Sequence, residues 1–465
     1  MRCNNPGVNT TAVHQQGAAS PRSMAHWLGC AHRGQTLAGV GIFSAGIRRV
    51  QCSAQPGRSS IQANVENSFA DKAAPGLPLP ATMRTMEPLL QSWTERVRQA
   101  AASRAGLRIR GGGSKDFMAR SLQGERLDTR EYAGITSYEP SELVVTVRAG
   151  TPLAELEAAL AEQGQCLAFE PPHFARSGPA SATVGGMVAA GLSGPARASV
   201  GGVRDYVLGL NLINGRGELL SFGGQVMKNV AGYDVSRLMV GAAGTLGLIT
   251  EVSLKVLPVA PAQASLVFEL DQALALAQLH RWGGQPLPLN ASCWVRDSGR
   301  GRLFVRLRGA VAAVEAACHK MLAQVSGTRM DNAQAGPDWD ACRDLRLPFF
   351  APPSAPELGL WRLSVAQTAP LLELPWEQLV EWHGAQRWLW APIAATQALR
   401  EAALQAGGHA SLFIAPGAAS GLERRAPLPG ALERIGQRLK AEFDPAGIFN
   451  PEPLPDQDSH PVATQ

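Results

Sequence analysis

The chain has few of the residues from which metal sites and disulfide frameworks are built. Among 465 residues there are seven cysteines, and no two of them form a Cys-x-x-Cys pair. An odd, scattered set argues against a disulfide framework and against an iron–sulfur cluster held by this chain. We therefore expect free thiols in a reducing compartment and no metal site. The cysteines are Cys3, Cys30, Cys52, Cys166, Cys293, Cys318 and Cys342.

Long apolar runs and a strong charge of either sign are also missing. No uninterrupted apolar stretch reaches about 18 residues, so direct membrane insertion is not expected. The formal charge is only +5, and the first 65 residues hold six arginines and no lysine, aspartate or glutamate. The rest of the chain is therefore almost neutral, which gives no argument for a nucleic-acid partner. We expect a cytoplasmic protein whose contact with the inner membrane, if it has one, is made through partner proteins.

Residues 1–82 form a leader rich in Arg, Ser, Gln and Gly that lacks hydrophobic periodicity. This composition is shared by targeting segments. It is also what upstream sequence joined by a mis-assigned start codon would give. We favour the second interpretation because regular patterning begins only after Met83 and Met86. Either way the leader is predicted to be disordered and to carry no chemistry. Residues 454–465 are a polar tail.

The length predicts two or three domains with a sizeable core. Residues 83–258 show a helix over 87–104, strands over 107–110, 127–130, 143–148 and 248–257, and a hairpin over 207–222. A further helix is predicted to begin with Thr151 as its N-cap. Pro258 and Pro261 mark a boundary. In residues 262–453 the helices 271–282, 311–324 and 430–443 alternate with short strands, so the predicted class is α+β for both parts.

Two glycine-rich stretches stand out in the first part. Arg110-Gly-Gly-Gly-Ser114 lies between expected strands, where successive main-chain N–H groups would suit a diphosphate. An ordinary glycine-rich turn is the competing interpretation. The second stretch is Gly241-Ala-Ala-Gly-Thr-Leu-Gly-Leu-Ile-Thr250, which follows Lys228-Asn-Val-Ala-Gly-Tyr-Asp234. No Walker A sequence occurs, and no acidic ribose ligand follows in a βαβ unit, so a nicotinamide site is not expected.

Taken in order, six motifs resemble the FAD-binding domain of the vanillyl-alcohol oxidase (PCMH) superfamily. Residues 84–453 as a whole resemble the family of FAD-binding accessory subunits of glycolate oxidase. The likeness also covers Trp361-Arg362, Ala406-Gly-Gly-His-Ala410 and Asp444-Pro-Ala-Gly-Ile-Phe-Asn-Pro451. The six motifs are Arg110–Ser114, Asp128–Gly134, Pro140–Pro152, Thr183–Gly191, Val203–Asp205 and the stretch 228–250.

The resemblance implies a two-subdomain FAD-binding domain followed by a smaller α+β cap, and it implies where FAD lies. The first glycine turn would hold the diphosphate, and Asp128 and Thr129 would flank the adenosine. Asn450 would reach the flavin end. Asp234 and Tyr233 fit core hydrogen bonding equally well. The implied cofactor-binding residues are Arg110, Gly111, Gly112, Gly113, Ser114, Asp128, Thr129, Thr183, Gly185, Gly186, Ala189, Asp234, Gly244, Thr245, Gly247, Ile249 and Asn450.

Two departures from the family pattern matter. Members with covalent FAD carry a histidine in the first glycine turn, where this chain has Gly113-Ser114, so non-covalent FAD is expected. Many relatives carry Ser-Glu in the second glycine loop, where this chain has Ala242-Ala243. That change removes a carboxylate and leaves any role of that residue in doubt.

Oxidation of a 2-hydroxy acid such as glycolate needs a hydride acceptor, a base for the hydroxyl and a cation for the carboxylate. Flavin would supply the first. The protein must supply a base and an arginine clamp. The candidates are His409, Arg362 and Arg387. His409 lies between glycines and an alanine, where an imidazole can be exposed, although a structural histidine is the competing interpretation. No cluster of metal-ligating histidines stands out.

Three functions stay open at this point. In the first, the chain would be an FAD subunit of a multi-subunit glycolate oxidase that passes electrons to a partner iron–sulfur subunit. Alternatively, it is a structural or electron-relay subunit, and a paralogous flavin subunit binds substrate. The third possibility is a stand-alone oxidase, which the missing substrate cluster disfavours. The expected partners are thus a paralogous FAD subunit, an iron–sulfur subunit and a small 2-hydroxy acid.

Overall fold

The computed structural model describes residues 87–119, 123–174, 182–224, 234–416 and 423–451. The chain divides into two units, residues 1–79 and 80–465, and all described residues belong to the second. The predicted leader, the stretch Lys228–Tyr233 and the polar tail lie outside the described residues.

A five-stranded antiparallel sheet forms the centre of the first half, with the order β3-β4-β8-β6-β7. Helix α3 (Leu153–Glu162) buries Leu153, Leu156 and Leu160 against it, because residues three and four apart share one helix face. The same core includes α4 (Val184–Ala190). The strands are β3 (Ile135–Glu139), β4 (Val144–Arg148), β6 (Val207–Ile213), β7 (Leu219–Gly223) and β8 (Leu248–Lys255).

A separate pair of parallel strands, β1 (Leu107–Arg110) and β2 (Glu125–Asp128), places Arg110 opposite Asp128. Helix α2 (Pro88–Ser103) packs beside this pair through Leu90, Trp93 and Val97, and the predicted helix over 87–104 is confirmed. The other elements are 3₁₀ turns at Asp116–Met118, Pro140–Glu142 and Val203–Asp205, the pair β5 (Gln165–Cys166) and β9 (Leu257–Pro258), and the short helices α5 (Arg197–Val200) and α6 (Val235–Leu238).

Two local predictions are wrong. Thr151 is not an N-cap, because α3 begins at Leu153 with Pro152 in the cap position. The Thr151 hydroxyl instead donates to the Arg148 carbonyl oxygen at 2.8 Å. The strand predicted over 127–130 ends at Asp128, whose carboxylate accepts the Arg130 N–H at 3.1 Å and turns the chain.

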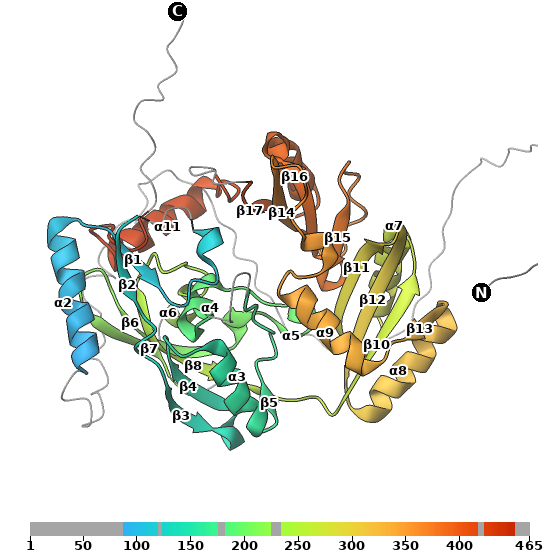
Figure 1. Cartoon of the computed structure of the whole chain (residues 1–465), viewed down its shortest axis with the longest axis horizontal. Helices are drawn as coiled ribbons and strands as arrows, with labels where there is room; N and C mark the ends of the chain where they lie inside the picture. The colour runs from blue at the N-terminus through green and yellow to red at the C-terminus, as the bar shows by residue number, and fades with distance from the viewer. Residues whose placement is uncertain (1–86, 120–122, 175–181, 225–233, 417–422, 452–465) are drawn as a thin grey trace, which may run out of the picture. The chain divides into compact units, whose positions relative to one another are not determined.

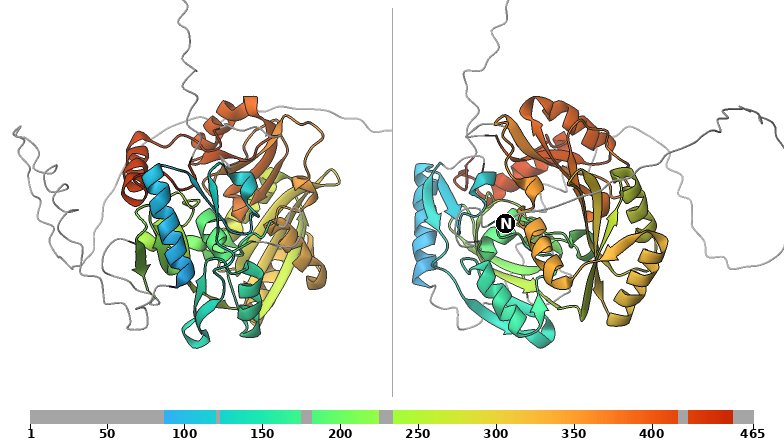
Figure 2. Two further views of the ribbon diagram at one scale, coloured as in Figure 1. Left: turned by 60° about the vertical axis from the view of Figure 1, so that its left-hand side comes forward. Right: turned by 45° about the vertical axis from the view of Figure 1, so that its right-hand side comes forward.

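An eight-stranded sheet dominates the second half, with the order β13-β10-β12-β11-β15-β16-β14-β17. One face carries α7 (Gln272–Gly283), α8 (Val311–Gln324) and α10 (Thr396–Gln405); the other face carries α9 (Asn332–Arg343) (Figures 1 and 2). The strands are β10 (Ala262–Glu269), β11 (Leu289–Asp297), β12 (Arg300–Gly309), β13 (Gly327–Arg329), β14 (Leu358–Ser364), β15 (Gln378–Glu381), β16 (Gln386–Pro392) and β17 (His409–Ile414). Further 3₁₀ turns lie at Pro348–Phe350, Trp382–Gly384 and Ile393–Ala395.

The α9 face of this sheet meets the first half of the chain. Phe174 and Leu192 belong to the same hydrophobic cluster as Trp388 and Phe413. A charged contact lies at the same junction. The buried guanidinium of Arg306 on β12 donates to both oxygens of Glu170, at 2.6 and 2.7 Å.

The chain returns to the first half at its end. After α11 (Gly430–Phe443), the Leu107 N–H donates to the Ile448 carbonyl at 2.7 Å, and the Asn450 N–H donates to the Leu107 carbonyl at 2.8 Å. We keep the domain boundary between β9 and β10 as a proposal. These contacts support adding residues from 430 onward to the first domain rather than the second. Within the described residues, no helix combines the length and the apolar character needed to span a membrane.

Candidate functional site

The first glycine turn is packed against the start of α4. A Cβ atom on Gly111 would collide with the Thr183 hydroxyl oxygen. Gly113 has φ of 78°, a left-handed conformation that favours glycine. The turn therefore depends on its glycines. The structure thus brings together Gly111 and Thr183, two predicted cofactor residues that lie far apart in the sequence.

Helix α4 is positioned by its own N-cap and by a close approach to the sheet. The Thr183 hydroxyl accepts the Gly186 N–H at 3.2 Å, and the Gly185 N–H donates to the Ala149 carbonyl at 2.8 Å. A Cβ on Gly185 would lie 2.7 Å from the Ala149 Cβ. Any larger residue at 185 would thus push α4 away from β4.

The second glycine loop is tied to α4 and to the C-terminal segment. The Ala243 N–H donates to the Ala189 carbonyl at 2.8 Å. The Asn450 amide donates to the Ala243 carbonyl at 2.7 Å and accepts the Ile109 N–H at 2.8 Å. Asn450 therefore connects the loop to β1, directly before the first glycine turn.

The second glycine loop, the end of β1 and Asn450 line a cleft of about 1090 Å³. Its walls are Arg108–Arg110, the loop from Gly241 to Leu246, part of α11 and the segment that ends at Asn450. A Cβ on Gly244 would lie 2.7 Å from the Asn450 amide nitrogen, so glycine lets the loop pack closely against Asn450 there. A cleft of this volume fits a ligand as large as a dinucleotide.

Four of the predicted cofactor residues form hydrogen bonds or ion pairs with other residues of the protein, through the side chain or the main chain. Asp128 binds Arg126 and Arg130, and the hydrogen bond from Arg130 does most to lower its pKa, to about 2. Thr129 is buried, and its N–H donates to the Arg110 carbonyl. Asp234 caps α6 by accepting the Arg237 N–H at 3.1 Å. The Ser114 hydroxyl lies 3.3 Å from the Lys115 ammonium. Their role toward a cofactor stays a prediction.

The three catalytic candidates lie on the eight-stranded sheet but not on one face. In the β14–β16 ladder Arg362 lies opposite Trp388, and Arg387 lies opposite Leu363. Successive side chains of a strand alternate between faces. Arg362 therefore faces the first half of the chain, and Arg387 faces α10. His409 lies opposite Ser364, two residues from Arg362, and so shares the face of Arg362.

Arg387 is completely buried and bound to main chain. Its guanidinium donates to the carbonyls of Gly384 and Ala369 at 3.3 and 2.9 Å, and burial lowers its pKa to about 10. These contacts support a structural role. The structure does not bring Arg387 together with Arg362 and His409.

Arg362 carries a charge that no described residue neutralises. It has no hydrogen-bond or ion-pair partner among the described residues, and its Nε is shielded from solvent. Its guanidinium lies 5.5 Å from the centre of the Phe413 ring. Burial, followed by the like charges of Arg197 and Arg425, lowers its pKa to about 10. An arginine in this state is suited to bind a carboxylate through two parallel N–H bonds.

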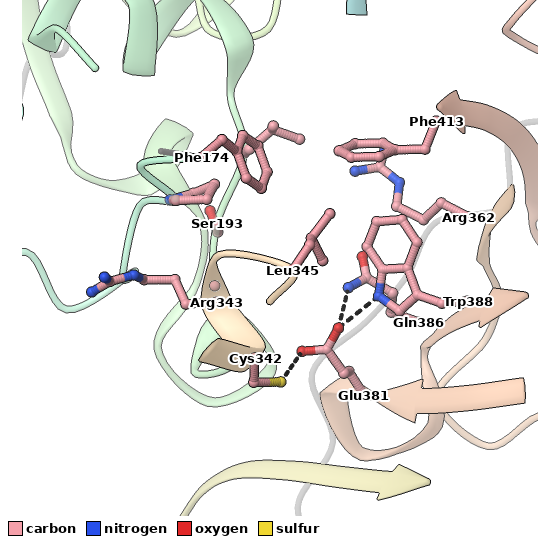
Figure 3. Close-up of a pocket in the computed structure, with 13 residues that line it drawn as sticks. Phe174, Ser193, Cys342, Arg343, Leu345, Arg362, Glu381, Gln386, Trp388 and Phe413 are labelled. Carbon is pink, nitrogen blue, oxygen red and sulfur yellow. Dashed lines mark hydrogen bonds between the residues drawn. The ribbon is translucent and has the colours of Figure 1, made fainter. Parts of the chain in front are cut away.

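Arg362 lines a small cavity of about 20 Å³ at the junction of the two halves (Figure 3). Phe174, Leu345, Gln386 and Trp388 also face it. Phe174 and Leu345 have φ angles of 50° and 54°. Trp382 and His383, which precede Gln386 in the sequence, have φ angles of 54° and 55°. Left-handed residues other than glycine are strained, and such strain clusters at functional sites.

A buried carboxylate, which the sequence analysis missed, closes this cavity. Glu381 accepts hydrogen bonds from Trp388 Nε1 at 2.6 Å, Gln386 Nε2 at 3.0 Å and Cys342 Sγ at 3.2 Å (Figure 3). Burial raises its pKa. The signal in the sequence was a glutamate at the end of one strand and a glutamine at the start of the next, both beside runs of apolar residues.

Lys115 and His383 were also missed. Burial lowers the pKa of Lys115 to about 8, and its Nζ lies 5.6 Å from the centre of the Phe174 ring. The His383 imidazole lies between the hydroxyls of Ser292 and Ser199, at 3.0 and 3.1 Å, and burial lowers its pKa to about 4. Neutral His383 thus joins α5 to the eight-stranded sheet. The described residues hold no group of three or more metal-ligating side chains.

Comparison with known proteins gives a consistent result. Residues 91–223 match the family model described as an FAD binding domain. The chain is 44% identical over 361 residues, 78% of this chain and 96% of the relative, to glycolate oxidase subunit GlcE of Escherichia coli (strain K12). Glycolate oxidase subunit GlcD of Bacillus subtilis (strain 168) is 33% identical over 31% of this chain and 30% of its own length.

A solved structure shows the same fold at low identity. It is an alkyldihydroxyacetonephosphate synthase with a TM-score of 0.55 and 16% identity, over 77% of this chain and 73% of its own. At this identity the likeness concerns the fold alone. The comparisons confirm the predicted α+β fold with an FAD-binding domain, and they confirm FAD as the cofactor.

Proposed function

Because this chain belongs to the family of glycolate oxidase subunit GlcE, we propose that it is the FAD-binding subunit of a multi-subunit oxidase that converts glycolate to glyoxylate. Electrons pass through the flavin to a partner iron–sulfur subunit. The observation that carries the proposal is the unneutralised Arg362, which faces a strained junction beside an FAD-binding domain. Absence of a cysteine cluster in the sequence supports a separate iron–sulfur protein.

FAD supplies the hydride acceptor when it is bound. The protein holds it mainly by main chain, at the turn Gly111–Ser114, at α4 and at the loop Gly244–Gly247. Steric contacts at Gly111, Gly185 and Gly244 support this assignment, since a side chain at each would displace Thr183, Ala149 or Asn450 and separate the elements that form the site. Binding is non-covalent, because Gly113-Ser114 stands where covalent members carry a histidine.

The substrate is bound and oriented by side chains of the eight-stranded sheet. Arg362 binds the carboxylate. His409 is the base for the hydroxyl proton. Burial and the charge of Arg362 lower the pKa of His409 below its ordinary 6.5, so its imidazole is neutral at pH 7 and able to accept a proton. Arg387 keeps a structural role.

A relay role remains the second candidate. The chain is similar to both a GlcE and a GlcD subunit, which supports an oxidase that contains two related flavin subunits. In this arrangement the paralogous subunit binds glycolate, and the FAD of this chain transfers electrons or is structural.

Helix α11 is the surface that best suits a partner subunit. None of its 14 residues is buried, and Leu432 and Ile435 on the helix are each 53% exposed, as is Leu428 just before it at 59%. The side of the helix that carries Phe443 and Lys440 contacts the first half of the chain, whereas these apolar side chains face solvent. We assign this face to the paralogous flavin subunit. Ile435→Asp should lower co-purification with that subunit, whereas Leu404→Asp, at the 72% exposed Leu404 on α10, should not. Equal loss in both variants would contradict the assignment.

The main experiment records the visible spectrum of the purified chain, alone and with its co-purifying subunits, before and after glycolate is added without oxygen. Bleaching of the flavin band in the isolated chain supports the proposed function. Bleaching only in the complex supports the relay role, and absence of flavin in both contradicts the proposal. Cell fractionation tests the proposed location, in the cytoplasm or on the inner membrane through the partners.

A further inference from the structure

Two buried polar atoms that line the cavity beneath Arg362 have no partner among the described residues. Gln386 is 3% exposed and its Oε1 lacks a donor, and Arg362 Nε lacks an acceptor. Figure 3 shows the Gln386 amide between the Glu381 carboxylate and the Arg362 side chain. A buried polar atom left unsatisfied costs about 1–3 kcal/mol. A ligand that satisfies one acceptor and one donor at once is therefore favoured here.

Glu381 determines which end of the Gln386 amide faces the cavity. The Gln386 Nε2 donates to Glu381 at 3.0 Å, and the same carboxylate accepts from Trp388 and Cys342. A carboxylate surrounded by donors holds the amide nitrogen. The carbonyl oxygen of Gln386 is thereby turned toward the cavity. Glu381 is a positioning residue for Gln386.

We propose that this cavity binds the hydroxyl group of the 2-hydroxy acid and that Gln386 is the residue that recognises it; this rests on the proposed function. A carbonyl oxygen accepts a hydrogen bond and cannot bind a carboxylate oxygen, which has no hydrogen to donate. In the bound substrate an alcohol hydroxyl satisfies both free atoms: it donates to Gln386 Oε1 and accepts from Arg362 Nε–H. Oxidation then requires the hydroxyl to exchange Gln386 for His409 as its acceptor before the proton is removed. The other N–H groups of Arg362 remain for the adjacent carboxylate.

The size of the cavity supports a hydroxyl rather than a larger group. Its volume of about 20 Å³ has room for one water-sized group. Leu345, Phe174 and Trp388 form apolar walls, and the left-handed backbone of Leu345 and Phe174 fixes two of them. The site therefore selects small acids with a free hydroxyl beside the carboxylate. It excludes acids whose hydroxyl carries a methyl group.

The test uses the assembled, flavin-loaded oxidase and compares Gln386→Met with Gln278→Met. Gln278 is a matched control, because it is 7% exposed with an unpartnered Nε2 on α7. We expect Gln386→Met to raise KM for glycolate about tenfold, as for one lost hydrogen bond. The inhibition constant of acetate, which lacks the hydroxyl, should stay unchanged. Methoxyacetate should inhibit no better than acetate. Gln278→Met should change none of these values.

A second variant covers a failure of Gln386→Met to fold, which thermal unfolding and flavin content report. In Glu381→Gln the new amide can donate to the Gln386 oxygen and turn its nitrogen toward the cavity, so KM for glycolate should again rise and the acetate constant should not. A rise of both constants together, or of neither, overturns the inference while the oxidase function stands. Equal binding of acetate and glycolate by the wild type would mean that the cavity holds only water. Absence of glycolate oxidation by the wild-type oxidase would instead contradict the proposed function.

Discussion

The glycine-lined cleft and the cavity beneath Arg362 are built from different parts of the chain. Around the cleft, glycines let the main chain of neighbouring elements pack closely, and a Cβ at Gly111 or Gly185 would meet Thr183 or Ala149. In the cavity, charged and polar side chains from several strands meet, and Arg362 and Gln386 keep free hydrogen-bonding groups. The difference suits a resident cofactor at the cleft and, at the cavity, a transient small acid whose hydroxyl is hydrogen-bonded by Gln386 and whose carboxylate is bound by Arg362.

The largest effect should follow from blocking the main-chain site. Gly185→Val places a branched side chain where even a Cβ would lie 2.7 Å from Ala149. We expect loss of most bound FAD and a lower unfolding temperature, because a ligand bound only to the native state stabilises it. Flavin absorbance per protein and thermal unfolding measure both effects.

Gly283→Val is the matched control for this experiment. A Cβ on Gly283 would meet no atom within 4 Å, and the residue lies at the end of α7, far from the cleft in the sequence. This variant should keep its flavin. Full flavin occupancy in Gly185→Val would show that the cleft is not held by α4.

Two arginines of the eight-stranded sheet should differ in their effect on stability. Arg306→Leu leaves Glu170, whose side chain is only 15% exposed, without its main partner, and removal of one member of a buried pair costs about 3–5 kcal/mol. Arg362→Leu removes an unpaired charge, so the free energy of unfolding should stay the same or rise. Urea unfolding measures both. A comparable destabilisation by Arg362→Leu would mean that Arg362 has a structural role.

The smallest effect concerns Asp128, whose pKa of about 2 lies below the ordinary 3.8. A lowered pKa contributes stability that is complete above the ordinary value and is lost as the pH falls through about 2. The side chain is 29% exposed, so solvent screening limits the contribution to below about 1 kcal/mol. Asp128→Asn should therefore be slightly less stable than wild type at pH 7, and the difference should shrink toward pH 2.

Urea unfolding at pH 7 and at pH 3 checks this prediction. Asp338→Asn, at an exposed carboxylate of α9 without an ion pair among the described residues, is the control. Loss of FAD in Asp128→Asn at pH 7, without a change in Asp338→Asn, would support the predicted contact of Asp128 with the adenosine side. Unchanged FAD content would leave Asp128 with only its role between Arg126 and Arg130.

The two regions also differ in how far the sequence predicts them. A glycine-rich turn is encoded by a few consecutive residues. Arg110–Ser114 and the loop after Gly241 could therefore be recognised in the sequence as short motifs that occur in the expected order. Glu381 and Gln386 acquire their meaning only when β15 and β16 pair and α9 covers them. The same sheet separates Arg362 from Arg387. Arg362 pairs with Trp388, the residue after Arg387, so the two arginines point to opposite faces of the sheet. Side-chain register of this kind is a property of the tertiary fold.

The central claim is that Arg362 binds the carboxylate of glycolate beside the flavin of this chain. The most direct test mixes glycolate without oxygen with flavin-loaded wild type and with Arg362→Leu, and follows the flavin band. We expect the flavin band of the wild type to bleach. Arg362→Leu should lose about a hundredfold in apparent affinity for glycolate, because a bidentate charged pair is worth about 3 kcal/mol. The flavin content of the two proteins should be equal. Equal bleaching of the two proteins at the same glycolate concentration would contradict the claim.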